Sequence, residues 1–466
     1  MRTTALLALL GAGCSSSWSA SPDMSPPGTF IQADTQRPGD PQAGYTALVN
    51  NGYIGCGIPW SVYSQYSSII TGGMPQEMLP GRTGHNAQLP YWLTATTTAS
   101  GVEVVSANCL TCHAGHINGQ LIVGLGAADR DFTSDPSGNA QQSTILTNDP
   151  KEKAEITKWA DRVAAIGPYT TTRTVGVNPA DNLAAVLFAH RDPKTLAWSD
   201  TPLLELPPAT VIPVDVPPWW RMQKKNAMFY DAGGRGDHAR IMMTASTLCT
   251  DSVTEAQQID SYFNDIRAYI YSLTAPAYPF PIDATLAANG KPVFEANCAT
   301  CHGTYGPKGG YPNYWIDTVQ VGTDSALATG GSQFAQRFVD WFNTSFYGQT
   351  AHLDPQPGYV APPLDGIWAT APYLHNGSVP TLAALLDSPT RPKYWTRTFK
   401  STDYDQSAVG WKFTAVDHGQ DAEPNAALKI QIYDTTLAGY TNGGHTYGDA
   451  LSAADRAALI EYLKTL

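Results

Sequence analysis

Two copies of the pattern C-x-x-C-H constrain what this chain can fold into more than any other feature. Two thiols one helical turn apart can add to the two vinyl groups of a haem, and the histidine that follows then lies under the iron as its proximal ligand. With seven cysteines and ten histidines in 466 residues, roughly 0.002 such matches are expected by chance. We therefore predict two covalently bound haem c groups. The attachment residues are Cys109, Cys112 and His113 for the first haem, and Cys298, Cys301 and His302 for the second.

A redox-active cysteine pair and a zinc site are the alternatives for these motifs. Both use cysteines two residues apart. Neither explains why a histidine follows each pair directly, so covalent haem remains the preferred interpretation.

The chain follows the same plan twice. A predicted helix over 285–297 leads to the second motif, and an amphipathic helix that begins after Ser452 ends the chain. A predicted helix over 254–273 lies at nearly the same distance after the first motif. A helix, the motif, a long loop and a final helix are the layout of small c-type cytochrome domains.

We therefore predict a mainly α-helical fold with extensive ordered loops, built from two tandem class I cytochrome c-like domains. The N-terminal domain takes residues 45–274 and the C-terminal domain residues 285–466, with a Pro-rich linker over 275–284. The 41 glycines and 35 prolines account for the loops expected around each haem.

The first residues resemble a bacterial export signal of the lipoprotein type. A short basic start and an apolar stretch fill residues 1–14, and Cys14 would be lipidated as the first mature residue. Residues 15–44 would then be a tether. Plain cleavage, or a start codon placed elsewhere, is the alternative. We expect an exported protein, periplasmic or anchored to the outer membrane as a lipoprotein, or extracellular, and touching the membrane only through its lipid.

Composition excludes some partners. The formal net charge is −12, which argues against nucleic acid as a partner. No apolar run approaches the length that a membrane-spanning helix needs. Of the cysteines outside the motifs, Cys56 and Cys249 remain once Cys14 is set aside. They would form a disulfide in an oxidising compartment, or two separate buried thiols.

The second axial ligand decides what each haem can do. No methionine lies in the C-terminal domain, so the methionine ligand of many electron-transfer cytochromes is absent there. His445, in a Gly-rich loop before the final helix, is the preferred second ligand of the haem on His302. A surface role for His445 is one alternative, and Tyr373 as an unusual ligand is another.

The sequence shows no clear second ligand for the haem on His113. His116 follows too closely to reach the other face of that haem. Four methionines are available, but such residues are more often part of a core. An open face that binds a gas is therefore the preferred hypothesis. The four methionines are Met222, Met228, Met242 and Met243.

Three segments resemble the rubber oxygenases, exported di-haem c-type cytochromes that cleave poly(cis-1,4-isoprene) with dioxygen. The segments are Pro217–Tyr230, with the run PPWWRMQKKNAMFY, Gly234–Met243, with GRGDHARIMM, and Ala361–Pro380, with APPLDGIWATAPYLHNGSVP. The last also resembles the wider group of bacterial di-haem cytochrome c peroxidases. The resemblance extends from about residue 45 to the C-terminus, although this chain is shorter than the rubber oxygenases around residue 375.

The resemblance implies a division of labour between the haems. The haem on His113 would have one protein ligand and bind oxygen, and the haem on His302 would be bis-histidine with His445. Phe229 and one of Trp219 or Trp220 would cover the oxygen, unless they are ordinary core residues.

The segment shared with the peroxidases contains two further candidates. His375 and Tyr373 would lie near the second haem or between the two haems. A purely structural role in hydrogen bonding is the alternative for both.

Two functions of different classes follow. The first is a haem dioxygenase that uses O2 to cleave C=C bonds of an apolar alkene or polymer, with the second haem tuning or replenishing the first. The second is electron transfer or peroxide reduction with a periplasmic electron donor. A lipid-anchored haem protein with a sensory or structural role is a third interpretation.

Overall fold

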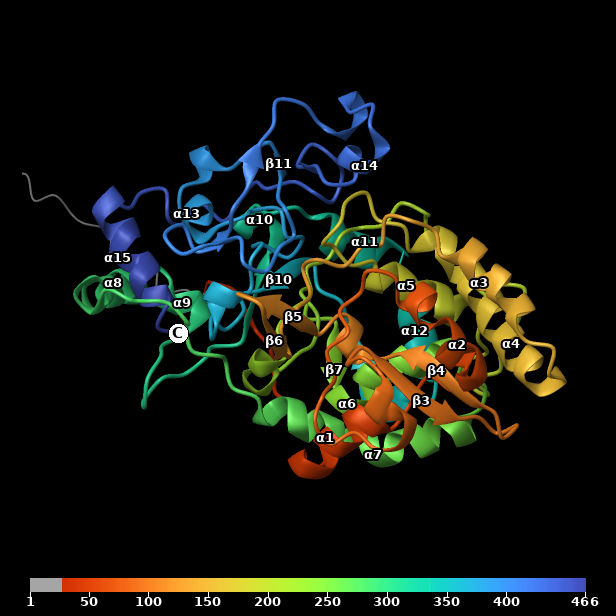
Figure 1. Cartoon of the computed structure of the whole chain (residues 1–466). Helices are drawn as coiled ribbons and strands as arrows, with labels where there is room; N and C mark the ends of the chain where they lie inside the picture. The colour runs from red at the N-terminus through yellow and green to blue at the C-terminus, as the bar shows by residue number, and fades with distance from the viewer. Residues whose placement is uncertain (1–26, 335) are drawn as a thin grey trace, which may run out of the picture.

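Two crossing helix pairs repeat in the computed structural model, which describes residues 27–334 and 336–466 (Figure 1). In the N-terminal half, α1 packs on α7, and in the C-terminal half α8 packs on α15. Both crossings depend on a glycine. A Cβ at Gly44 would lie 1.8 Å from the Asp265 carbonyl oxygen, and one at Gly290 would lie 2.0 Å from the Ala458 carbonyl oxygen. The predicted internal repeat thus has a physical counterpart in two close helix contacts.

The helices begin where capping residues satisfy their free N–H groups. Ser252 caps α7 and Ser452 caps α15, each accepting a hydrogen bond from the residue three positions on. The predicted helices over 254–273, over 285–297 and after Ser452 are confirmed. The helices are α1 (Pro41–Asn50), α2 (Trp60–Thr71), α3 (Ser137–Ser143), α4 (Pro150–Ile166), α5 (Ala180–Ala189), α6 (His238–Met242), α7 (Val253–Ser272), α8 (Ala284–Asn297), α9 (Ala299–His302), α10 (Thr318–Val321), α11 (Ala326–Phe334), α12 (Gln336–Thr344), α13 (Leu382–Leu385), α14 (Ala426–Lys429) and α15 (Ala453–Leu463).

Short strands make the fold a mixture of helix and sheet, so the expectation of a mainly α-helical fold needs correction. The three-stranded sheets have the orders β2-β4-β3, β1-β8-β10 and β14-β11-β15, and β5–β6, β7–β9 and β12–β13 are pairs. The strands are β1 (Thr29–Phe30), β2 (Ile58–Pro59), β3 (Leu93–Thr97), β4 (Glu103–Ala107), β5 (Ala114–Ile117), β6 (Gln120–Val123), β7 (Gly234–Gly236), β8 (Tyr314–Asp317), β9 (Ala351–Leu353), β10 (Gly358–Val360), β11 (Tyr394–Thr396), β12 (Tyr404–Asp405), β13 (Gly410–Trp411), β14 (Thr414–Ala415) and β15 (Tyr433–Asp434). Strands this short carry no readable alternation of polar and apolar residues.

The two halves are interleaved in space. Helix α12, from the C-terminal half, lies beside α5 of the N-terminal half, with Trp341 stacked on Phe188 at a ring distance of 4.3 Å (Figure 1). Trp341 Nε1 also donates to the Arg191 carbonyl oxygen at 2.6 Å. Strand β7 pairs with β9, and β1 pairs with β8. The linker over 275–284 therefore divides the sequence but not the hydrophobic core.

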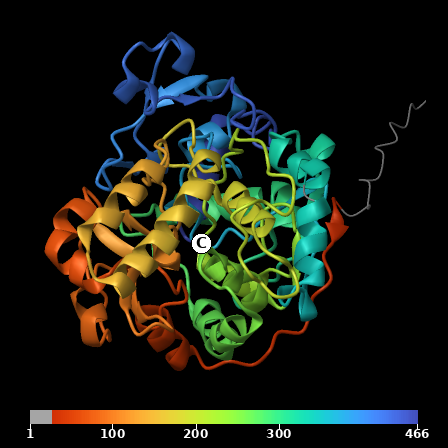
Figure 2. The same ribbon diagram turned by 90° about the vertical axis from the view of Figure 1, so that its right-hand side faces the viewer.

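The N-terminal residues that the structure describes lie against the body. Of the segment expected to be a tether, residues 27–44 contain β1, buried Ile31 and the start of α1 (Figure 2). The export signal over 1–14, with Cys14, lies outside the described residues. Within 27–334 and 336–466, no helix combines the length and the apolar character needed to cross a membrane.

Candidate functional site

The first C-x-x-C-H motif forms a 3-10 turn, Cys109–Thr111, just after β4. Polar groups from distant segments fix both of its sulfur atoms. The Tyr53 hydroxyl donates to Cys109 Sγ at 3.0 Å, and Asn178 Nδ2 donates to Cys112 Sγ at 3.1 Å. The two cysteines are not bonded to each other, so both are available for thioether bonds to haem.

An aromatic ring holds the histidine of this motif. The Trp219 indole stacks on His113 with ring centroids 4.9 Å apart and planes 23° apart. Burial lowers the pKa of His113 to about 4, and the Pro217 carbonyl opposes this shift. The imidazole is therefore neutral at neutral pH, which is the form that ligates iron. Trp219 is a neighbour of the predicted proximal ligand, a contact the sequence did not indicate.

The second motif follows α8 without a break. Its α9 turn ends at His302, and Gly303 then leaves the helix with φ +80°. His302 Nδ1 lies 2.8 Å from the Pro362 carbonyl oxygen. A carbonyl can only accept, so Nδ1 carries the proton and Nε2 keeps its lone pair for a metal.

His445 faces His302 across a gap that fits one iron atom. Their ring centroids are 6.1 Å apart, with planes 57° apart. Metal–nitrogen bonds of about 2 Å on both sides of one iron place two such rings about 6 Å apart. Burial, followed by the charges of His302 and Arg391, lowers the pKa of His445 to about 3, so this ring is also neutral. The residues of the second site therefore fit a bis-histidine haem.

The segment after Trp219 joins the two sites. The 3-10 helix Trp219–Lys224 begins at His113 and ends beside Asp365, three residues beyond the carbonyl that holds His302. Trp220 Nε1 donates to the Asp365 carbonyl oxygen at 2.8 Å, and Arg221 Nε donates to the same oxygen at 2.9 Å. Trp220 is 5% exposed and packs in the C-terminal core. The two tryptophans named by the resemblance thus contact different halves of the protein.

Phe229 has a different environment. It is 43% exposed and has φ +68°, in a turn closed by mutual backbone hydrogen bonds between Met228 and Gly234. A positive φ is uncommon for a large side chain. The turn holds the ring of Phe229 out of the core, so ordinary core packing does not describe it.

The four candidate methionines of the first half pack in or against the N-terminal core. Met243 is fully buried there, and Met222, Met228 and Met242 are partly buried at the edge of the same core. Their environment matches the interpretation of these residues as core side chains.

Tyr373 and His375 lie in the core of the C-terminal half. The Tyr373 hydroxyl lies 3.3 Å from the Ile367 carbonyl oxygen and 3.2 Å from that of Val409. His375 stacks on Tyr359 at 4.0 Å, and burial lowers its pKa to about 4. These contacts describe structural roles for both side chains.

Two neighbours of the first motif carry no mark in the sequence. Tyr53 and Asn178 reach the first motif only through tertiary folding, and no motif marks them. His238 lies in the segment GRGDHARIMM, 2% exposed, with Nδ1 2.6 Å from the Tyr271 hydroxyl and Nε2 buried without a partner. Among the described residues, no group of three or more histidine, cysteine or acidic side chains is placed to hold a metal ion.

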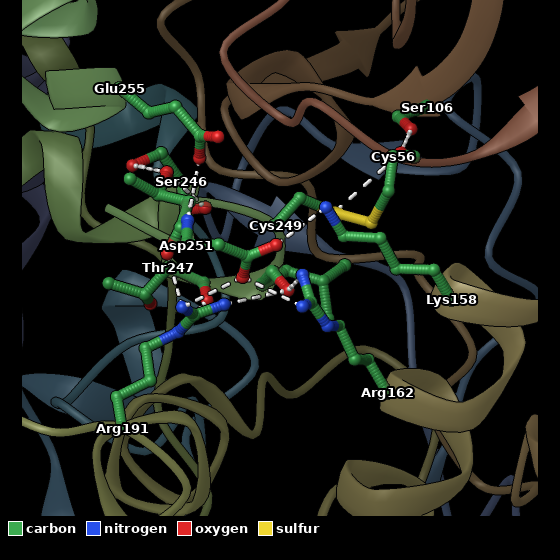
Figure 3. The surroundings of a disulfide bond; sticks show 12 residues. Cys56, Ser106, Lys158, Arg162, Arg191, Ser246, Thr247, Cys249, Asp251 and Glu255 are labelled. Atoms are coloured by element: carbon green, nitrogen blue, oxygen red, sulfur yellow. Dashed lines mark hydrogen bonds and ion pairs between the residues drawn. A yellow bond between two sulfur atoms is a disulfide. The ribbon is translucent and has the colours of Figure 1, made fainter. Parts of the chain in front are cut away.

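Cys56 and Cys249 form a disulfide that closes a separation of 193 residues (Figure 3). Cys249 lies two residues before Asp251, which binds Lys158 at 2.6 Å and Arg162 at 2.7 Å. Fully buried Arg191, from a distant part of the chain, contacts the same segment, with Nη1 3.2 Å from the Asp251 carboxylate. The disulfide and the ion cluster together fasten residues 247–251 to the N-terminal core.

Comparisons with known proteins agree with this geometry. Residues 358–396 match the family model described as RoxA-like, cytochrome c-like. Uncharacterized protein y4iM of Sinorhizobium fredii (strain NBRC 101917 / NGR234) is 29% identical over 324 residues, which are 59% of this chain and 69% of the relative. Uncharacterized protein y4iJ of the same organism is 28% identical over 294 residues, 48% of this chain and 46% of the relative. The chain thus spans less than half of the second relative.

The matched segment includes Pro362, which accepts a hydrogen bond from His302, and the whole of Ala361–Pro380, one of the three segments that indicated the resemblance. A cytochrome c-like domain implies covalently bound haem c. The predicted resemblance to the rubber oxygenase-like cytochromes is confirmed over residues 358–396, and this match supports a haem cytochrome.

Proposed function

We propose that this protein is an exported di-haem c-type cytochrome that uses dioxygen to cleave C=C bonds of an apolar substrate such as poly(cis-1,4-isoprene). The reaction centre is the haem on His113, and the haem on His302 and His445 is an electron-transfer group. One observation carries the proposal: the two motifs differ in what faces their histidines. His302 faces a second imidazole at 6.1 Å, whereas His113 packs on the indole of Trp219.

A haem attached at Cys109, Cys112 and His113 supplies oxygen binding and the oxidising chemistry. The chain supplies position and environment. Trp219 fixes the plane of the His113 ring, and the hydroxyl of Tyr53 orients one attachment sulfur. Burial keeps His113 neutral, so that its lone pair is free for iron.

The exposed Phe229 ring supplies an apolar surface for an alkene. Such a substrate offers no group for acid–base chemistry, and apolar contact is the interaction that it can make. The turn around Met228 and Gly234 fixes this ring without burying it.

Oxygen uptake decides between the candidate activities. We expect purified protein mixed with polyisoprene latex to consume oxygen and release oligomers with aldehyde and ketone ends, without added peroxide. Latex alone and boiled protein are the controls. Turnover of a reduced cytochrome only after H2O2 is added would instead assign the protein to the peroxidases. Inactivity in both assays would leave electron transfer as the remaining candidate function.

Phe229→Ala is expected to lower oxygen uptake while leaving the fold intact. Because the side chain is 43% exposed, its removal should change the free energy of unfolding by no more than about 0.5 kcal/mol. Trp219→Ala is the matched contrast. That ring is 4% exposed, and its loss should cost about 3–5 kcal/mol. Urea unfolding gives stability, and an oxygen electrode gives uptake. Unchanged uptake in Phe229→Ala would remove this residue from the substrate surface.

Export and the lipid anchor at Cys14 are part of the same proposal. The sequence pattern over 1–14 supports them, and the disulfide between Cys56 and Cys249 suits an oxidising compartment.

A further inference from the structure

The 39 residues that match the family model contain neither axial histidine of the second haem, yet they contact both. Near the start of residues 358–396, the Pro362 carbonyl accepts from His302 Nδ1. Near the end, Arg391 binds the loop that carries His445.

Arg391 uses its whole guanidinium group to join two pieces of backbone. Its Nη1 donates to the carbonyl oxygens of Asn442 and Gly444, both at 2.7 Å, and its Nη2 donates to that of His445 at 3.1 Å. The other donors bind the end of α13, with Nη2 2.9 Å from the Leu385 oxygen and Nε 3.2 Å from the Ala384 oxygen. All these acceptors are main-chain carbonyls, so the contact fixes backbone position.

The loop that carries His445 needs such contacts because its own backbone conformation is unusual. His445 has φ +45° and Gly444 has φ +69°. A residue other than glycine at positive φ is strained and persists only when its surroundings hold it there. The backbone N–H of His445 donates to the Val321 carbonyl oxygen at 2.8 Å.

Other contacts fasten the same loop to the segment around Arg391. Asn442 Nδ2 donates to the Pro392 carbonyl oxygen at 2.9 Å, and Ser388 donates through its backbone N–H and its hydroxyl to the Asp449 carboxylate at 2.8 and 2.5 Å. Arg391 is the member of this set that contacts the backbone of the histidine itself.

We propose that Arg391 is a positioning residue that keeps His445 on the iron of the second haem and thereby keeps that haem closed to external ligands. This inference rests on the proposed bis-histidine site. Five donors in a rigid planar fork suit five carbonyls from two segments, whereas the lysine ammonium offers three donors at one point. Without the guanidinium of Arg391, the backbone strain at His445 favours movement of this loop away from the iron.

The test measures ligand binding by the full-length protein with both haems attached. Carbon monoxide binds ferrous haem only where an axial position is open. Arg391→Gln is expected to bind one more CO per chain than the wild type and to lose low-spin signal in the absorption and electron paramagnetic resonance spectra. Arg391→Lys should bind an amount of CO between that of the wild type and that of Arg391→Gln. His445→Ala removes the proposed second ligand itself and so gives the largest gain in CO binding to compare with.

Two further variants control for local damage. Arg456→Gln removes contacts from Arg456 to Asp387 at 3.1 Å and to the Leu451 carbonyl oxygen at 3.0 Å. These contacts lie beside the same loop, and we expect this variant to keep the CO capacity of the wild type. Gly444→Ala disturbs the loop from its other side, because a Cβ there would lie 2.1 Å from the Gly322 carbonyl carbon. It should open the haem as Arg391→Gln does. If Arg391→Gln does not fold, Arg391→Lys tests the guanidinium in its place.

The outcomes separate the two proposals. If His445→Ala leaves CO binding and the spectra of the wild type unchanged, the bis-histidine assignment fails. If His445→Ala opens the haem but Arg391→Gln does not, the assignment stands and the positioning role of Arg391 is overturned, whatever the result with Gly444→Ala. Equal opening by Arg456→Gln would also overturn it, since general loosening would then suffice.

Discussion

Replacement of Cys109 and Cys112 together by serine is expected to remove one covalent haem per chain and to abolish oxygen-dependent cleavage. The first motif would hold its haem through two sulfurs that accept hydrogen bonds from Tyr53 and Asn178, and serine cannot form the thioether. Whole-chain mass spectrometry counts the attached haems, and the oxygen electrode measures the activity.

The second motif provides the matched control. Cys298 and Cys301 replaced together by serine should also lose one haem, but the site on His113 should still bind one CO per chain. A chain that keeps two attached haems after either replacement would contradict the assignment of these cysteines. Activity that survives loss of the first haem would transfer the reaction centre to His302.

Removal of the disulfide is expected to produce the largest change in stability. Cys56 and Cys249 are separated by 193 residues, and the chain-entropy relation assigns about 5 kcal/mol to closing a loop of that size in the unfolded state. The double replacement Cys56→Ser and Cys249→Ser should therefore lower the midpoint of urea unfolding strongly, with the haem spectra of the folded state unchanged.

Reduction of the wild type is the control for this prediction. A mild reductant should lower the midpoint of the wild type to that of the double variant and should leave the variant where it is. Equal midpoints for oxidised wild type and variant would show that the ion cluster around Asp251 fastens this segment without the covalent bond.

The sequence was sufficient for features that local rules govern. The C-x-x-C-H spacing predicts the attachment residues. A capping serine with helical periodicity predicted α15, and helical periodicity after Thr254 predicted α7. His445 was reached by elimination, because no methionine lies in the C-terminal half. In the structure its ring faces His302 at a distance that suits one iron.

The sequence alone could not predict features that depend on contacts between distant residues. The stacking of Trp219 on His113 and the exposure of Phe229 follow from how the loops fold. The sequence of the segment that contains both residues therefore could not show that one is buried and the other exposed. Nothing local in α12 indicates that Trp341 belongs to the N-terminal core. The tandem-domain prediction therefore described the order of the haem motifs better than the division of the core.

Strand β1 cannot find its partner until most of the chain has been synthesised. Residues 29 and 30 pair with Trp315 and Tyr314, and the core around the first motif is completed by Phe338, Trp341 and Phe342. Contacts of such long sequence separation form late because the intervening loop must close first. Cys109 and Cys112 are therefore made long before the core can shut around them. This delay would keep the predicted attachment residues of the first motif accessible while the chain is still incompletely folded.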